Sequence, residues 1–418
     1  MPSVSRNVTP GLISDPAPAP TSKSFLEPLA VGETFDPTLG LPTPALTLDL
    51  SATLGNIDAM GQWIAAHGAE LVPHGKTTMA PAIWHAQLAA GATGITVANT
   101  AQARVAIDAA MPFVIIANQV VSPPALTWLA QVLADGAVSI VCWVDSVAAV
   151  EIMQSHLVGA GAAKPLGVCV ELGWPGSRTG LRSHEEAFAV AEAVQRSSAL
   201  SLVGVSGYEG TIPDAGPESM GQVDSFLSAM AELFGALSGS FETDRPILTA
   251  GGSAFFDRVI DIFGPAIAAV AGARLIVRPG AYVLHDHDHY RDLTPAATRE
   301  GPSLTPATTL WGRVVSTPEP GLALLDVGKR DVAYDLGLPT PRVRRRAGSP
   351  ATDVTAHVTA CNDQHAYVEH AGALEVGDLL ELGQGHPCAI ADKWREIPIT
   401  SRLDDDTLRL DGFVRTYF

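Results

Sequence analysis

Eight short apolar segments recur between residues 71 and 280, and their regular spacing most limits how this chain can fold. Each segment ends in small or polar residues and precedes an alanine-rich stretch with helical periodicity. The segments are residues 71–76, 94–99, 113–119, 139–146, 166–173, 202–210, 247–252 and 274–280. Eight strand–helix units predict an α/β fold, a closed parallel (β/α)8 TIM-type barrel, with an open doubly wound sheet as the alternative.

The residues before this pattern have a different character. Residues 1–40 are proline-rich and lack periodicity, which predicts an N-terminal arm that is extended or disordered. Residues 45–50 are interpreted as a strand that leads into the barrel, and Ser51 is a suitable N-cap for a helix over residues 52–67.

After about residue 306 the pattern changes to strand-like segments separated by turns. We therefore predict a barrel domain over residues 41–295, including its lead-in strand and helix, and a second, mainly β domain over residues 296–418. The basic segment 342–346 is interpreted as an exposed loop of this second domain.

Composition excludes several classes of function. The formal net charge is −18, which disfavours general binding to nucleic acid or to an anionic membrane surface. No apolar run is long enough to span a membrane, and the N-terminus has no signal-like segment. The four cysteines are too widely spaced to suggest a disulfide framework. These features predict a cytoplasmic protein.

The first barrel strand is expected to end at a single lysine, Lys76, in the motif Pro73-His74-Gly75-Lys76-Thr77. Barrel enzymes place their chemistry at such strand ends. A lysine that is partly removed from water has a lowered pKa, and its amine can attack a carbonyl group. Such a lysine suits pyridoxal 5′-phosphate (PLP), whereas the simpler alternative is an exposed lysine ahead of a helix.

A glycine pair, Gly251-Gly252, followed by Ser253 stands at the end of the seventh predicted strand. Glycines let backbone N–H groups approach an anion, and a following helix favours negative charge at its start. The segment is therefore a candidate phosphate site, although an ordinary strand-to-helix turn would have the same composition.

Two histidine-containing segments could bind a metal ion. His386 and Cys388 are separated only by Pro387, and an imidazole with a thiolate suits Zn²⁺, although a core cysteine beside a turn histidine is the plainer interpretation. The run His285-Asp286-His287-Asp288-His289-Tyr290 is also rich in ligand types. We interpret it as a linker with a structural aspartate.

Taken together, these residues resemble the alanine-racemase-like, or fold-type III, PLP enzymes from about residue 41 to the C-terminus. Within that group the sequence is similar to the D-serine dehydratase and D-threonine aldolase branch. The matching positions are Pro73-His74-x-Lys76-Thr77, the Arg178-x-Gly180 segment, Tyr208, Gly251-Gly252-Ser253, Arg278-Pro279-Gly280-x-Tyr282 with Asp286, and His386-x-Cys388. Thr78-Met79 departs from the branch, which often has His-Lys there.

The resemblance implies roles for these positions. Lys76 would carry PLP, and Arg178, Tyr208, Gly251, Gly252, Ser253 and Tyr282 would contact it. His386 and Cys388 match the zinc pair of D-serine dehydratases, where many D-threonine aldolases have His-x-Asp. The implied function is a PLP- and zinc-dependent dehydratase, an ammonia-lyase that converts a D-3-hydroxy amino acid such as D-serine to a 2-oxo acid and ammonia. The metal could be another divalent ion.

Two alternatives remain open. The same residues could serve a D-threonine aldolase, which cleaves the Cα–Cβ bond to give glycine and an aldehyde. A PLP-binding protein without catalysis is the second, which the predicted β domain and the His386-x-Cys388 pair disfavour. The expected partners are a small amino acid substrate and, as in relatives of the branch, a second copy of the chain in a homodimer.

Overall fold

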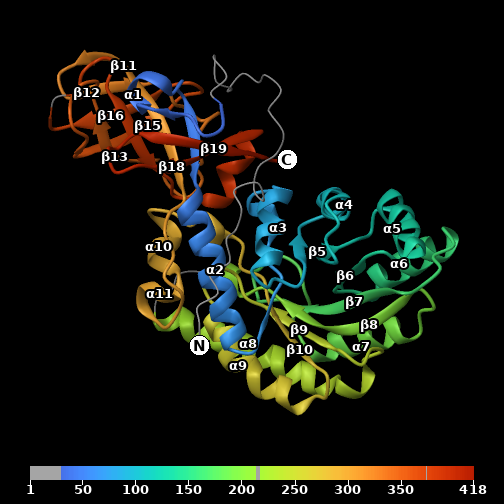
Figure 1. Ribbon diagram of the computed structural model, residues 1–418. Helices are drawn as coiled ribbons and strands as arrows, with labels where there is room; N and C mark the ends of the chain where they lie inside the picture. Colours follow the sequence, from blue (N-terminus) through green and yellow to red (C-terminus); the bar gives the residue numbers. More distant parts are fainter. Residues whose placement is uncertain (1–29, 213–216, 373) are drawn as a thin grey trace, which may run out of the picture.

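Eight parallel strands form a barrel in the computed structural model, which describes residues 30–212, 217–372 and 374–418 (Figure 1). The strands are β3 (Glu70–Leu71), β4 (Ile95–Val97), β5 (Phe113–Gln119), β6 (Ser139–Val144), β7 (Leu166–Leu172), β8 (Leu200–Gly207), β9 (Ile247–Ala250) and β10 (Arg274–Val277). They pair in chain order from β4 to β10, and β10 pairs with β3. The ring closes between His74 and Thr96, where the Thr96 N–H donates to the Pro73 carbonyl over 2.8 Å. The predicted fold class, a parallel eight-stranded barrel sheet with a mainly β second domain, is confirmed.

The barrel interior is filled by apolar side chains from the strands. Eight of them form one buried cluster: Val72, Phe113, Ile115, Val141, Trp143, Cys169, Ile247 and Ile276. A larger apolar core lies between the strands and the surrounding helices and continues into the β domain. A filled interior leaves the strand ends as the place for a ligand.

Helices surround the barrel, and α2 runs beside it from the β domain (Figure 1). The barrel helices are α2 (Leu50–Ala66), α3 (Pro81–Ala89), α4 (Thr100–Asp108), α5 (Pro123–Asp135), α6 (Val147–Gly159), α7 (His184–Gln195), α8 (Pro217–Ala236) and α9 (Phe256–Ala269). Helix α2 begins earlier than predicted because Asp49, not Ser51, caps it by accepting from the Ala52 N–H over 2.7 Å. None of the helices in the described ranges combines the length and apolarity needed to cross a membrane.

The second domain is an eleven-stranded, largely antiparallel sheet. Its strands are β1 (Thr34–Phe35), β2 (Ala45–Asp49), β11 (Thr308–Glu319), β12 (Leu322–Leu325), β13 (Thr340–Arg345), β14 (Thr352–Asp353), β15 (Ala356–Cys361), β16 (Ala366–His370), β17 (Leu379–Gly383), β18 (Glu396–Arg402) and β19 (Leu408–Arg415). Short helices α1 (Pro37–Gly40), α10 (His289–Leu293) and α11 (Pro295–Thr298) complete the fold.

Strand β2 corrects the predicted division of the chain. It pairs with β11 and β18, so the expected lead-in strand belongs to the C-terminal sheet and not to the barrel. Strand β1 likewise pairs with β19. The described end of the predicted N-terminal arm, residues 30–40, is therefore part of the second domain. Residues 1–29 lie outside the described ranges. Sequence periodicity could not indicate this because it does not specify a strand's partners.

The basic segment 342–346 is also placed differently from the prediction. It lies largely in β13, and only 8% of the Arg345 side chain is exposed. Arg345 pairs with Glu381 on β17, at 2.5 Å, and with Asp406. Arg346 donates to Asp378 over 2.7 Å. These arginines are drawn into the sheet because the neighbouring strand and turn present carboxylates that compensate their charge.

We expect Arg345→Ala to lower the free energy of unfolding by about 3 kcal/mol, because it leaves the Glu381 carboxylate buried without its main partner. This expected loss of stability lies near the lower end of the range for breaking a buried ion pair, because Arg402 still contacts Glu381 at 3.0 Å. Urea unfolding measures the change. The matched control is Arg342→Ala, an exposed arginine of the same segment, which should change stability by about 0.5 kcal/mol or less. Equal effects of both substitutions would contradict the burial argument.

Candidate active site

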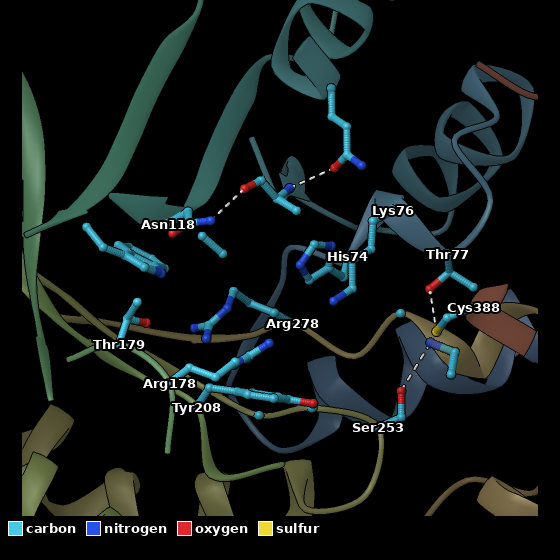
Figure 2. A pocket seen from close by; sticks show the side chains of 18 of the residues that line it. His74, Lys76, Thr77, Asn118, Arg178, Thr179, Tyr208, Ser253, Arg278 and Cys388 are labelled. Carbon is cyan, nitrogen blue, oxygen red and sulfur yellow. Dashed lines mark hydrogen bonds between the residues drawn. The ribbon is translucent and has the colours of Figure 1, made fainter. Parts of the chain in front are cut away.

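A cavity of about 520 Å³ opens at the C-terminal ends of the barrel strands, where the β domain meets them. Its wall combines residues from both domains, and Figure 2 shows their side chains converging on one space. The lining includes His74, Lys76, Thr77, Asn118, Trp143, Glu171, Arg178, Thr179, Tyr208, Gly251, Gly252, Ser253, Arg278, Tyr290, His386 and Cys388. The barrel end therefore carries the site, as its architecture predicts.

Lys76 lies in the short helical turn η2 (Gly75–Thr77), which follows β3 after Val72, Pro73 and His74, and its side chain enters the cavity (Figure 2). Burial lowers the pKa of Lys76, and the positive charges of Arg178 and Arg278 act in the same direction, against the opposing effect of Cys388. The neutral amine therefore persists to lower pH than in a free lysine, as a nucleophile or base requires.

His74 lines the same part of the cavity, and its Nδ1 atom has no hydrogen-bond partner within the described residues. Burial holds the pKa of His74 well below its usual range, and the charges of Lys76 and Arg278 lower it further. The imidazole is therefore neutral near pH 7, so it adds a polar group beside Lys76 without adding a charge.

The cavity floor is cationic and aromatic. Arg278 is a largely buried part of this floor, and it donates to the Thr249 hydroxyl and, over 2.8 Å, to the Gly207 carbonyl. Arg178 lies over the ring of Tyr208 with 5.0 Å between its guanidinium carbon and the ring centroid. Burial and the neighbouring Glu209 raise the pKa of Tyr208 to about 12, so its phenol stays neutral. Such a floor suits a flat, anionic molecule.

The predicted phosphate loop lines the cavity, but two of its backbone donors are already used. The Gly251 and Gly252 N–H groups donate to the Glu209 carboxylate over 3.0 and 2.6 Å, and Glu209 is fully buried. Ser253 differs, because its Oγ atom accepts from the Ala281 N–H over 3.1 Å and keeps its own proton to donate. We predicted that the Gly251 and Gly252 N–H groups donate to the phosphate, because the sequence does not show that Glu209 lies against them.

Gly251 and Gly252 cannot carry side chains, the first because of its backbone conformation and the second because of its close neighbours. Gly251 has a φ of +91°, in the left-handed region that favours glycine. A Cβ atom at Gly252 would lie 2.9 Å from the Tyr208 ring, closer than side chains tolerate. The loop can therefore approach the aromatic floor only without side chains at these positions.

His386 and Cys388 reach the cavity from the β domain, in and beside the turn η6 (Pro387–Ala389) after β17. The Cys388 sulfur lies 3.3 Å from the Thr77 hydroxyl, directly beside the Lys76 turn (Figure 2). The His386 Nδ1 atom lies 2.6 Å from an oxygen of Asp335. Although burial lowers the pKa of His386, its contacts with Cys388 and Asp335 outweigh that effect and raise it. No motif marked Asp335, because it is distant from His386 in the sequence.

Tyr282 is the predicted contact residue that the structure does not bring to the cavity. Its ring is buried, and its hydroxyl accepts from Gln87 on α3 over 2.8 Å, because the turn η5 (Ala281–Val283) directs it into the core. Tyr290 lines the cavity instead. All four cysteines are free, as expected.

The histidine run before Tyr290 forms a turn. Its buried Asp286 accepts from the Asp288 and Tyr290 N–H groups over 2.9 and 3.0 Å, which agrees with the structural aspartate that we predicted. Within the described ranges no cluster of three or more metal-ligating side chains is assembled, in this run or elsewhere.

The side chains that line the cavity have the chemistry that PLP binding requires. A buried lysine amine with a lowered pKa stands in the cavity, and the Ser253 hydroxyl and the cations of Arg178 and Arg278 suit a phosphorylated, anionic ligand. Tyr208 and Trp143 offer flat faces. The adjacent imidazole and thiol of His386 and Cys388 fit one zinc ion while leaving further positions for other ligands.

Comparison with known proteins agrees with this assembly. Residues 307–400 match the family described as "Putative serine dehydratase domain". A D-threonine aldolase from Arthrobacter sp. is 27% identical over 84% of this chain and 87% of its own. A D-threo-3-hydroxyaspartate dehydratase from Delftia sp. (strain HT23) is 28% identical over 91% of this chain and 98% of its own.

Solved structures show the same fold. D-threonine aldolase from Filomicrobium marinum superposes with a TM-score of 0.75 at 24% identity, covering 93% of this chain and 98% of that one. An alanine racemase-like protein from Idiomarina loihiensis gives 0.69 at 16% identity, covering 90% and 96%. These structures show that the chain has the alanine-racemase-like fold, and its similarity to aldolases and a dehydratase indicates an enzyme of the lyase class. The family match and the curated relatives confirm the resemblance of this chain to the D-serine dehydratase and D-threonine aldolase branch of that group.

Proposed function

We propose that this protein is a PLP- and zinc-dependent dehydratase that converts a D-3-hydroxy amino acid to a 2-oxo acid and ammonia. The observation that carries the proposal is that Cys388 and His386 open into the same cavity as Lys76. A cysteine-to-alanine mutant of a D-threo-3-hydroxyaspartate dehydratase, which has the same fold at 22% identity, is known in a metal-free form. A metal-free form implies that this dehydratase binds a metal, which supports a metal ion as part of the proposed function.

Lys76 would hold the cofactor and, once released from it, act as the base that takes the Cα proton of the substrate. PLP supplies an electron sink for the charge that develops at Cα. Burial lowers the pKa of Lys76, so a larger fraction of the amine is neutral and able to accept a proton than in a free lysine. The flanking cations of Arg178 and Arg278 favour negative charge within the cavity.

His386 and Cys388 would hold the metal ion, and the Cys388 sulfur lies beside the Thr77 hydroxyl. The ion supplies Lewis acidity, which makes the β-hydroxyl of the substrate a better leaving group. The thiol distinguishes this pair from a histidine–carboxylate pair, and thiolates favour zinc over harder ions. We therefore propose that the enzyme eliminates water from the substrate rather than cleaving its Cα–Cβ bond.

A panel of D- and L-3-hydroxy amino acids, including serine, threonine and 3-hydroxyaspartate, tests the proposal. Products are assayed as 2-oxo acid and ammonia for elimination, and as glycine for retro-aldol cleavage. We expect 2-oxo acid from a D-substrate. Glycine as the main product would make the protein an aldolase, and bound PLP with no product from any member would favour a non-catalytic PLP-binding protein.

We expect Gly252→Asp to weaken PLP retention roughly tenfold or more, since a displaced side chain in a packed site costs on the order of 1–3 kcal/mol. The new side chain would meet the Tyr208 ring, and its carboxylate would lie near Glu209 and the proposed phosphate position. PLP titration of the dialysed protein measures this. Gly264→Asp is the control, because no atom lies within 4 Å of a Cβ at Gly264. Unchanged PLP affinity in the Gly252 variant would place the phosphate elsewhere.

A further inference from the structure

A carboxylate from another loop of the β domain contacts the candidate metal ligand His386. Asp335 lies between β12 and β13, and its Oδ2 atom is 2.6 Å from the His386 Nδ1 atom. About half of the Asp335 side chain is exposed, so burial does not force this contact. Within the described part of the chain, the Asp335 carboxylate makes no other hydrogen bond.

The loop that carries Asp335 contacts the turn that follows the metal pair. The adjacent Tyr334 ring lies 5.7 Å from the Lys393 amine and 5.8 Å from the Lys329 amine. Lys393 belongs to η7 (Ala391–Lys393), which follows η6 directly. The contact with Lys393 connects the Asp335 loop to the segment that follows the metal pair, although the two are distant in the sequence.

The contact determines which ring nitrogen of His386 can bind a metal. An ionised carboxylate only accepts hydrogen bonds, so the Nδ1 atom must carry the proton that it donates to Asp335. The lone pair then lies on Nε2, and the carboxylate also makes the imidazole a stronger electron donor. Histidines that bind metals in proteins are commonly oriented by a carboxylate in this way.

We infer that Asp335 is a positioning residue of the metal site, which holds His386 in the tautomer and orientation that bind zinc through Nε2. The inference rests on the proposed function, because it requires His386 to be a metal ligand. Asp335 itself contacts neither the substrate nor the reacting atoms. Its contribution should therefore appear in zinc affinity itself, independently of turnover.

Zinc affinity of the PLP-loaded protein, measured by competition with a chromogenic chelator, tests this role. We expect Asp335→Ala to weaken zinc binding about 10- to 100-fold, the usual effect of losing such a partner. Asp335→Asn keeps an acceptor oxygen without the charge, so it should recover part of the loss. The control is Asp392→Ala, a partly exposed carboxylate near the same turn, which should stay within about twofold of the wild type.

The possible results separate this inference from the proposed function. If His386→Ala abolishes zinc binding but Asp335→Ala and Asp335→Asn bind as tightly as the wild type, Asp335 has no positioning role. If the wild-type protein binds no zinc, the metal assignment is wrong and the inference is overturned with it. An unchanged visible PLP band and an unchanged Tm of the metal-free variants would show that the fold is intact. A general loss of both in the Asp335 variants would instead assign Asp335 a purely structural role.

Discussion

Lys76→Ala should abolish turnover, with a fall of about 10³-fold or more in kcat. The substitution removes the amine that we assign both to holding the cofactor and to taking the Cα proton, and a positioned base alone contributes roughly 10²- to 10⁴-fold. The dialysed variant should also lose the visible absorption of lysine-bound PLP. Stopped-flow or steady-state assays of 2-oxo acid, together with absorbance spectra, measure both effects.

The matched control for this prediction is Lys164→Ala, which removes an exposed lysine after α6 and should leave both readouts unchanged. The fold of the Lys76 variant should survive, because the lysine side chain ends in a cavity and supports no core packing. A Lys76→Ala protein with wild-type turnover would exclude Lys76 as the cofactor-binding residue. A variant that lost the visible band but kept turnover would show that turnover does not require lysine-bound PLP, which would contradict the proposed mechanism.

Removal of the metal should stop elimination of water while PLP stays bound. A bound ion that polarises the leaving hydroxyl is worth several kcal/mol, so we expect a loss of about 10²- to 10³-fold in kcat after chelation, at about 1.4 kcal/mol per factor of ten. Cys388→Ala should reproduce the loss without chelator. Neither change removes Lys76 or Ser253, so the visible band should remain.

Cys361→Ala provides the control for the loss of a thiol, since Cys361 is a free cysteine of the same domain that does not line the cavity. Added zinc should restore the chelated wild-type protein but not the Cys388 variant. Exchange of the Cα proton with solvent requires the base and the cofactor but no leaving group, so it should survive in both. Full elimination activity in metal-free protein would show that His386 and Cys388 are structural.

The sequence by itself determined the barrel, because the burial of each parallel strand produces a local apolar run. Strands such as β5 and β7 lie within one or two residues of their predicted bounds. Lys76 and the His386-x-Cys388 pair could also be identified from the sequence, because each belongs to a short contiguous motif. Local chemistry of this kind depends on neighbouring residues and needs no knowledge of the partners.

Only the tertiary structure decided which distant groups meet. It joined β2 to the C-terminal sheet, turned Tyr282 toward Gln87 and drew Arg345 into the sheet against Glu381. In the tertiary structure the N–H groups of the phosphate loop also donate to Glu209, and Asp335 contacts His386. Strand pairing and buried charge compensation depend on groups dozens or hundreds of residues apart. Periodicity and spacing cannot specify such contacts, because they describe which face of an element is buried but not what lies against it.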